Sequence, residues 1–319
     1  MTEEEPSTPY LPPDPRLSEP RAAGRAFDGL APLYDRARPG YPGGIVSALV
    51  GGCRLDASSR LLEIGCGTGQ LTRDLAPSGA SICCVEPGAA LSALARGNLA
   101  RFSNVEVVTA RFEDFEAAPG SFDAVVSATA FHWVDPAVSF AKAAHLLRAG
   151  GCLALLTNCH VAGGSHTDPR FAGPVRRLHE RLAPELGTWS FPTAEKMARS
   201  VALGGDVAQL WSRVDRKTAE PPDVSALFAP PEVRAERWLA RYSRDGYLGM
   251  LATQSSYALL EEGRRRELLY EIGRLVDVVL GGVVTKSYLA LLATARRRPA
   301  SDGERDAGEA AGPSRPTAF

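Results

Sequence analysis

The sequence is poor in lysine, in long apolar runs and in net charge, and each shortage excludes a class of function. Only four of its 36 basic residues are lysine, and the formal net charge of the 319 residues is -1. Such a balance gives no general electrostatic attraction for nucleic acid or for an anionic membrane surface. No stretch approaches the roughly 18 apolar residues that a membrane-spanning helix needs. We therefore expect neither a nucleic-acid partner nor a membrane partner.

Patterns typical of metal sites and disulfide frameworks are also missing. The six cysteines include no C-x-x-C pair and show no metal-ligand spacing with the five histidines. We expect no metal, and a buried, reduced thiol at each cysteine, as in a cytoplasmic protein. The N-terminal segment is acidic and proline-rich and lacks the apolar core of a signal peptide, which also favours a cytoplasmic location.

What the sequence does contain is a strand-to-helix joint with closely spaced glycines. Residues 61–64 form a short apolar run that predicts a buried strand of an α/β sheet. A helix is predicted to begin near Thr68. Between them, three glycines alternate with single residues, at Gly65, Gly67 and Gly69. Glycine lets the backbone take positive φ and lets a ligand lie directly against it, so the joint predicts a site for a nucleotide-like ligand.

The spacing of the glycines narrows the choice of ligand class. A dinucleotide fingerprint needs a glycine where Gln70 stands, so an NAD-dependent oxidoreductase is the weaker alternative. Glu86 ends the next predicted strand, at 81–85, and Pro87 begins the turn after it. Its separation from the glycines is close to the ~20 residues found for the ribose-binding acid of dinucleotide folds. We predict that the Glu86 carboxylate accepts hydrogen bonds from both ribose hydroxyls.

Glu63, two residues before the first glycine, completes a string that resembles motif I of the class I S-adenosylmethionine-dependent methyltransferases. FDxxAxxYDRARPxYP at 27–42 and FHWVDP at 131–136 look like the trans-aconitate methyltransferase-like, small-molecule branch of that family. The resemblance implies S-adenosyl-L-methionine as cofactor and methyl transfer to O, N or C of a small molecule, a carboxylate or secondary metabolite among them. A protein of the same fold that binds this cofactor for a non-methylating reaction is a further alternative.

The resemblance also implies which residues meet the cofactor. The expected set is Tyr34, Arg38, Glu63, Gly65, Cys66, Gly67, Gly69, Glu86, Pro87, Phe112, Glu113 and Ala128. Tyr34 and Arg38 belong to the segment that folds over the cofactor in such proteins, where they meet its methionyl carboxylate or close the pocket. Arg111 stands where many relatives have an adenine-binding aspartate, which leaves Phe112 and either Glu113 or Asp114 as adenine contacts.

His132 is the predicted general base, because an imidazole accepts a proton near neutral pH. A wall or hydrogen-bonding role for this side chain stays open, and a carboxylate acceptor needs no base. The residues 130–133, Ala-Phe-His-Trp, replace the Asn/Asp-Pro-Pro-aromatic tetrad of enzymes that methylate amino groups of nucleic acids, which disfavours that substrate class. We expect His160, His166 and His179 on the surface or in loops.

Strands and helices alternate strictly up to Asn158, which predicts a doubly wound parallel sheet. The resemblance implies a Rossmann-like, seven-stranded methyltransferase sheet of α/β class, mostly parallel, with an antiparallel C-terminal edge and helical cap insertions. We expect a monomer or homodimer with one folded domain. The expected divisions are a disordered tail at 1–25, the domain at 26–295 with its cofactor-binding core at 26–158 and helical cap elements at 159–232 and 243–281, and a disordered tail at 299–319.

Overall fold

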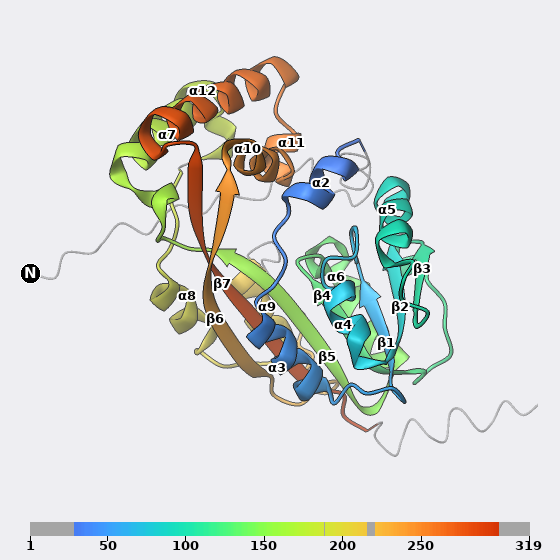
Figure 1. Cartoon of the computed structure of the whole chain (residues 1–319). Coiled ribbons are helices and arrows are strands. Elements are labelled where there is room, and N and C mark those ends of the chain that lie inside the picture. The colour runs from blue at the N-terminus through green and yellow to red at the C-terminus, as the bar shows by residue number, and fades with distance from the viewer. Residues whose placement is uncertain (1–28, 188, 216–220, 300–319) are drawn as a thin grey trace, which may run out of the picture.

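The structure is a computed structural model that describes residues 29–187, 189–215 and 221–299, and these residues build an α/β fold around one sheet (Figure 1). Its strands are β1 (Arg60–Ile64), β2 (Ser81–Glu86), β3 (Val105–Thr109), β4 (Phe122–Ala128), β5 (Leu147–His160), β6 (Glu232–Ser243) and β7 (Val283–Arg296). They lie in the order β3-β2-β1-β4-β5-β7-β6. Strands β1 to β5 pair in parallel, and β7 is antiparallel to both of its neighbours. The predicted fold class is confirmed.

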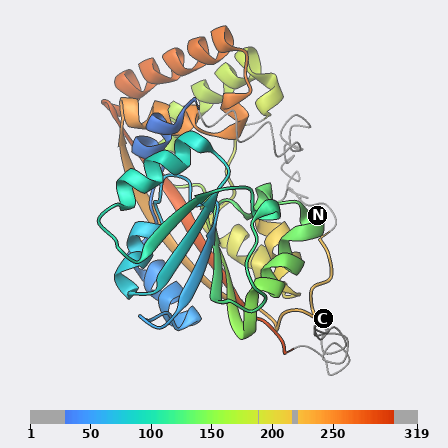
Figure 2. The same cartoon turned by 90° about the vertical axis from the view of Figure 1, so that its right-hand side faces the viewer.

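The central strands are apolar because helices cover both faces of the sheet. Leu61 packs in one buried cluster with Leu49 of α3 (Gly43–Cys53). Its neighbour Leu62 packs in a cluster on the opposite face with Phe140 of α6 (Pro136–Leu146). Successive strand residues point to opposite faces, so β1 must be apolar on both. Figure 2 shows the sheet between these helical layers.

A group of helices gathers at one end of the long strands β5, β6 and β7 (Figure 1). We call it the helical cap; its members are α7 (Pro169–Leu182), α10 (Arg244–Ala252), α11 (Ser255–Ala258) and α12 (Glu262–Leu280). Phe171, Tyr247 and Leu268 share its buried core. The short helix α2 (Ala31–Ala37) packs against α10 and so links the N-terminal segment to the helical cap.

Four further α-helices belong to the described part of the chain, and one of them begins later than predicted. They are α4 (Thr72–Leu75), α5 (Ala89–Leu99), α8 (Ala194–Val201) and α9 (Val207–Asp215). Helix α4 begins at Thr72 and not near Thr68, because the glycine turns extend through that position. Helices α8 and α9 are separate, since Gly204 and Gly205 lie between them with φ of 73° and 104°.

A disulfide corrects the expectation that every cysteine is a reduced thiol. Cys53, at the end of α3, is joined to Cys152 of β5, with the two Cα atoms 5.3 Å apart. That separation lies within the ~4.4–6.8 Å found for disulfides. The partners are 99 residues apart in sequence and meet only because α3 packs against β5, so spacing could not reveal the pair. The other four cysteines, Cys66, Cys83, Cys84 and Cys159, are not disulfide-bonded.

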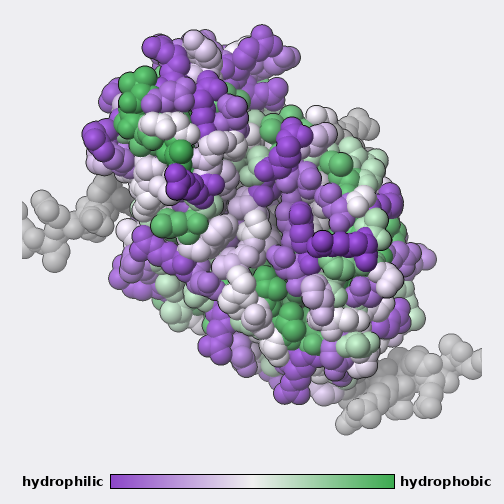
Figure 3. Space-filling model, in the orientation of Figure 1, coloured by the Kyte–Doolittle hydropathy of each residue, from purple (hydrophilic) through white to green (hydrophobic). Residues whose placement is uncertain are grey.

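The surface carries no large apolar feature in the view of Figure 3, where hydrophilic side chains dominate and the hydrophobic patches are small and separate. Within the described ranges, no helix combines the length and the apolar character needed to cross a membrane. The same residues contain no group of three or more His, Cys, Asp or Glu side chains placed to hold a metal ion.

Candidate active site

The loop after β1 bends at glycines in the left-handed region. Gly65, Gly67 and Gly69 have φ of 69°, 59° and 89°. A Cβ at Gly65 would collide with Cβ of Ala130, and one at Gly67 would lie 3.4 Å from Cε1 of Tyr34. Both the conformation and the crowding therefore require residues without a side chain here.

Glu86 lies directly against this loop. Its Oε2 accepts a hydrogen bond from the Gly67 amide and its Oε1 accepts one from the Gly88 amide, each at 2.9 Å. The side chain is buried, at 5% exposure. A carboxylate has about four acceptor positions. The two amides hold this carboxylate against the loop and fix the shape of the loop.

A cleft opens beside the loop and encloses about 590 Å³ of space, including its mouth. We call it the glycine-loop cleft; it is lined by Tyr34, Arg38, Pro39, Tyr41, Glu63, Gly65, Cys66, Gln70, Ala128, Thr129, Asn158, His160, Met250 and Tyr288. The cleft lies at the carboxyl ends of β1, β4 and β5, where the order of the parallel strands reverses. Open α/β sheets bind ligands at such a switch point.

Glu63 contributes a buried carboxyl group to the cleft. The Thr72 hydroxyl donates to its Oε2 at 2.7 Å. Burial raises the pKa of Glu63 to about 7, because a low-dielectric site disfavours the charged form; the Thr72 hydrogen bond opposes this rise and the nearby Glu86 charge adds to it. Glu63 therefore populates both protonation states near neutral pH.

Arg38 places a guanidinium group in the same cleft. Its Cζ lies 5.0 Å from the centroid of the Tyr34 ring, and its Nη2 donates to the backbone oxygen of Thr253. Its Nε is buried and has no hydrogen-bond partner among the described residues. A buried N–H of this kind favours an acceptor on a ligand, and the positive charge favours an anionic one.

Two cleft residues to which the sequence analysis assigned no role, Tyr41 and Thr129, meet at the carboxyl end of β4. The hydroxyls of Tyr41 and Thr129 are 2.9 Å apart. Thr129 has φ of 57°, a conformation that β-branched residues rarely adopt and that costs on the order of 1–3 kcal/mol. Its amide donates to the Leu156 oxygen at 2.8 Å, which helps to hold the turn. The only sequence signal for Thr129 was its place just beyond a parallel strand.

Three further missed residues, Asn158, His160 and Tyr288, come from β5 and β7. The Asn158 Oδ1 accepts from Trp238 Nε1 at 3.0 Å, and its Nδ2 donates to the Gly40 oxygen at 3.0 Å. His160 and Tyr288 are register partners with ring centroids 5.2 Å apart. Burial, with the positive charge of nearby side chains, lowers the pKa of His160 well below its usual value. His160 was expected on the surface or in a loop; it ends strand β5, is half-buried and lines the cleft.

Of the other two histidines expected on the surface or in loops, His166 lies in a loop, in the 3-10 turn Ser165–Thr167, and His179 lies on α7; both are buried. His166 and His179 have 0% and 2% exposure. His179 Nδ1 lies 2.8 Å from the Val175 oxygen and its Nε2 lies 2.6 Å from the Tyr257 hydroxyl. A carbonyl oxygen can only accept, so Nδ1 carries the proton and Nε2 accepts from Tyr257. The amphipathic face of α7 turns His179 into the cap core, which its residue type did not indicate.

The predicted cofactor residues fall into three groups. Those that line the glycine-loop cleft are Tyr34, Arg38, Glu63, Gly65, Cys66 and Ala128, and those in the adjoining loop and strand end are Gly67, Gly69 and Glu86. Outside that lining, Phe112 is buried in the core beneath α6, Glu113 pairs with Arg111 at 3.0 Å, and Pro87 is exposed.

The structure does not bring His132 into the lining of the glycine-loop cleft. It lies in a 3-10 turn (Phe131–Trp133), and its ring centroid is 4.9 Å from that of Trp133. It lines a separate hollow with Phe140 of α6 and Trp211 of α9. The expected role of His132 as a base stays a prediction, without support from this placement.

Residues 62–155 match the family model described as "Methyltransferase domain". An uncharacterized methyltransferase of Mycobacterium tuberculosis is 33% identical over 133 residues, which are 42% of this chain and 52% of that protein. The "Probable S-adenosylmethionine-dependent methyltransferase" of Saccharomyces cerevisiae is 30% identical over 127 residues, 38% of this chain and 43% of its own length. The chain thus spans about half the length, or less, of these curated relatives.

A solved structure supports the fold independently. A candidate type II methyltransferase from Anaeromyxobacter dehalogenans is 24% identical, with a TM-score of 0.50 over 82% of this chain and 99% of that one. The methyltransferase likeness of residues 62–155 covers β1 to β5, and therefore includes the glycine loop and Glu86.

Proposed function

We propose that this chain is an S-adenosylmethionine-dependent methyltransferase that acts on a small-molecule acceptor. The observation that carries the proposal is the Glu86 carboxylate, which is fixed to the Gly67 amide beside a cleft at the switch point of the sheet. The match of residues 62–155 to the methyltransferase domain, and the names of the relatives, agree with it.

The chemistry of the cleft fits the cofactor group by group. The buried, unpartnered Nε of Arg38 suits the methionyl carboxylate. Glu86 suits the ribose hydroxyls, and Glu63 in its ionised form balances the positive charge of the sulfonium and amino groups. The Gly67 backbone, which has no Cβ, allows the cofactor to approach beside Tyr34.

When bound, S-adenosylmethionine supplies an electrophilic methyl group whose bond to sulfur breaks with the electron pair passing to sulfur, while a lone pair of the acceptor forms the new bond. The protein needs no covalent step. Its residues hold the acceptor in line and exclude water, which can supply most of the acceleration. An acceptor that loses a proton needs a base. His160 lines the cleft and the predicted His132 does not, but burial and nearby positive charge hold the pKa of His160 well below its usual value and weaken it as a base.

The assignment to a branch of the methyltransferase family rests on two short sequence segments. The segments 27–42 and 131–136 favour the trans-aconitate methyltransferase-like branch, although residues 27 and 28 lie outside the described residues. We infer a single methyltransferase domain at 26–295, with a cofactor-binding core at 26–158 and cap elements at 159–232 and 243–281. The predicted tails at 1–25 and 299–319 lie outside the described residues, except for residue 299.

Calorimetry with S-adenosylhomocysteine and with NAD tests the proposal directly. We expect the wild type to bind the first and not the second. Gly67→Val should weaken binding at least 10-fold, because a side chain there is strained at φ 59° and crowds Tyr34. Gly97→Val is the matched control, since no atom lies within 4 Å of a Cβ at that exposed position. A wild type that binds neither S-adenosylmethionine nor S-adenosylhomocysteine would reject the proposal.

The non-methylating alternative needs a second measurement. Release of S-adenosylhomocysteine upon addition of an acceptor, with a mass increase of one methyl group in that acceptor, supports methyl transfer. Conversion of the acceptor without release of S-adenosylhomocysteine would instead favour a protein that uses the bound cofactor without consuming it.

A further inference from the structure

A second hollow adjoins the glycine-loop cleft and encloses about 510 Å³, including its opening. We call it the lysine pocket; its walls include His160, His179, Trp189, Phe191, Tyr257 and Lys286. The lysine pocket lies between the ends of β5 and β7 and the helical cap. His160 lines both hollows, so a ligand in the lysine pocket lies next to one in the glycine-loop cleft.

Lys286 is the unusual group in this pocket. It is wholly buried on β7, at 0% exposure, and its Nζ has no hydrogen-bond partner among the described residues. The Nζ lies 4.3 Å from the ring centroid of Phe191 and 5.5 Å from that of Tyr288. Aromatic faces attract a cation but do not replace the hydrogen bonds that its three N–H groups make in water.

The surroundings of Lys286 supply positive charge and no counterion. Burial alone lowers its pKa to about 7, and no acidic side chain of the described part pairs with it. The charge of Lys286 in turn helps to lower the pKa of His160 and of His166, and Arg38 acts on His160 in the same direction. A buried ammonium group without a carboxylate partner is unfavourable unless a ligand provides one.

The other walls fit the body of such a ligand. Trp189 packs edge-on against Phe191, with ring centroids 5.1 Å apart, and lies 4.7 Å from the His179 ring. The hydrogen bond between His179 and Tyr257 holds two of these rings in place. Fixed aromatic rings favour a flat, apolar group that can pack against their faces and edges.

We propose that the lysine pocket holds the methyl acceptor and that Lys286 selects an acceptor with a carboxylate group on a flat, apolar body. The identification of this ligand as the methyl acceptor rests on the proposed function. The anion site is argued from the geometry of the lysine pocket alone. Lys286 pairs with the carboxylate, the aromatic rings pack against the body, and the shared His160 wall sets the ligand beside the cofactor.

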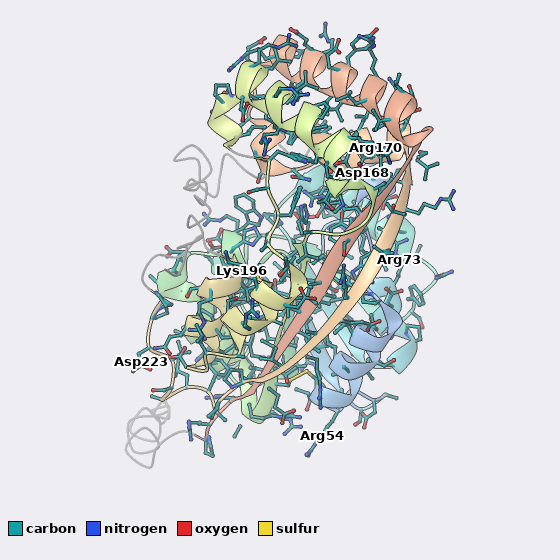
Figure 4. The ribbon with its side chains drawn as sticks, turned by 90° about the vertical axis from the view of Figure 1, so that its left-hand side faces the viewer. Arg54, Arg73, Asp168, Arg170, Lys196 and Asp223 are labelled. Atoms are coloured by element: carbon teal, nitrogen blue, oxygen red, sulfur yellow. A yellow bond between two sulfur atoms is a disulfide. The ribbon has the colours of Figure 1, made fainter. Side chains whose placement is uncertain are left out.

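Benzoate and its neutral counterpart benzamide test this selection. Each is titrated calorimetrically into the full-length wild type that is saturated with S-adenosylhomocysteine. We expect benzoate to bind at least 10-fold more tightly than benzamide. Lys286→Met and Lys286→Gln should each remove that preference, while Lys196→Met should keep it. Lys196 is an exposed lysine on α8, labelled in Figure 4, and provides the same chemical change away from the lysine pocket.

Stability and cofactor binding separate this role from a structural one. Both Lys286 variants should unfold at a temperature no lower than the wild type and bind S-adenosylhomocysteine with unchanged affinity, because an unpaired buried charge has been removed. Equal binding of benzoate and benzamide, no benzoate binding at millimolar concentration, or full benzoate binding by the variants would each overturn the proposal. Variants that bind benzoate normally but lose turnover would show that Lys286 is a base and not an anion site.

The same titrations distinguish the two proposals. Lysine-dependent benzoate binding by a wild type that fails to bind S-adenosylhomocysteine would support the anion site and reject the proposed function. Binding of S-adenosylhomocysteine without lysine-dependent benzoate binding would support the proposed function and reject the anion site.

Discussion

The backbone amide of Gly67, in the loop after β1, donates a hydrogen bond of 2.9 Å to the side chain of Glu86 at the end of β2. This bond connects the carboxyl ends of two neighbouring parallel strands. The shape of the glycine loop therefore depends on an acid that follows it by 19 residues. A substitution of Glu86 therefore changes two things together: the shape of the glycine loop and the carboxylate that we propose to bind the ribose.

Glu86→Gln should weaken binding of S-adenosylhomocysteine by about 10- to 100-fold, because hydrogen bonds to a charged acceptor contribute roughly 1.5–3 kcal/mol. Calorimetric titration measures the loss. Glu106→Gln is the matched control, since Glu106 is an exposed acid on the adjacent strand β3. Equal affinity of wild type and Glu86→Gln would contradict a direct role for this carboxylate.

Arg38→Met should also weaken binding of S-adenosylhomocysteine, by about 10-fold or more, if its buried Nε meets the methionyl carboxylate. Arg38→Lys should recover only part of the loss, because an ammonium group cannot reproduce the planar fork of a guanidinium group. Arg54→Met is the control; Arg54 is exposed at the end of α3 and labelled in Figure 4. A normal affinity in Arg38→Met would place the carboxylate elsewhere.

Glu63 should make the protein less stable as the pH rises from about 4.5 to about 7. Its folded-state pKa is raised to about 7, so in this window the unfolded chain loses the proton first and unfolding becomes easier. The free energy of unfolding should fall by up to about 3 kcal/mol from this group and then stay level. Urea unfolding at several pH values measures the slope.

Glu63→Gln isolates this contribution, because an amide of the same shape does not titrate. The variant should lack the part of the slope that Glu63 causes, while the histidines and Lys286 titrate equally in both proteins. The exposed acid variant Glu106→Gln should keep the wild-type slope. Identical pH profiles for the wild type and Glu63→Gln would show that Glu63 ionises normally.

The disulfide predicts a thiol count. Denatured without reductant, the protein should expose four reactive thiols, and after reduction six. Cys53→Ala should lower the free energy of unfolding by about 2–5 kcal/mol under oxidising conditions, since the bond closes a long loop of the unfolded chain. Under reducing conditions the difference should shrink to that of a buried side-chain truncation. Six thiols before reduction would rule out the bond.

The local sequence pattern was sufficient to predict the strands and the turn that form the glycine loop. The apolar strands, the glycines between them and Glu86 all lie within residues 60–86. The rule that parallel strands bind ligands at their carboxyl ends predicts that they meet. The strict alternation predicted up to Asn158 did not reveal that β5 continues to His160. Its pairing with β7 runs to that residue, and pairing with a distant strand leaves no local signal.

The rest of the site depends on contacts between distant segments. His160 meets Tyr288 through antiparallel register, and Lys286 comes to the lysine pocket on the same strand. Nothing in the run VVTKSYLA shows that its lysine is buried, because lysine is almost always exposed. The sequence does not reveal the left-handed backbone conformation of Thr129 either, because β-branched residues rarely adopt it.

Strand β7 is the last strand along the described chain, yet it lies inside the sheet between β5 and β6. It also carries Tyr288 and Lys286, one wall of each hollow. A nascent chain on the ribosome can therefore assemble the parallel half of the sheet early, but it gains both walls only when residues 283–296 have emerged and inserted. Competence to hold two ligands side by side therefore arises only after this strand has been made, and not when the parallel strands first pair.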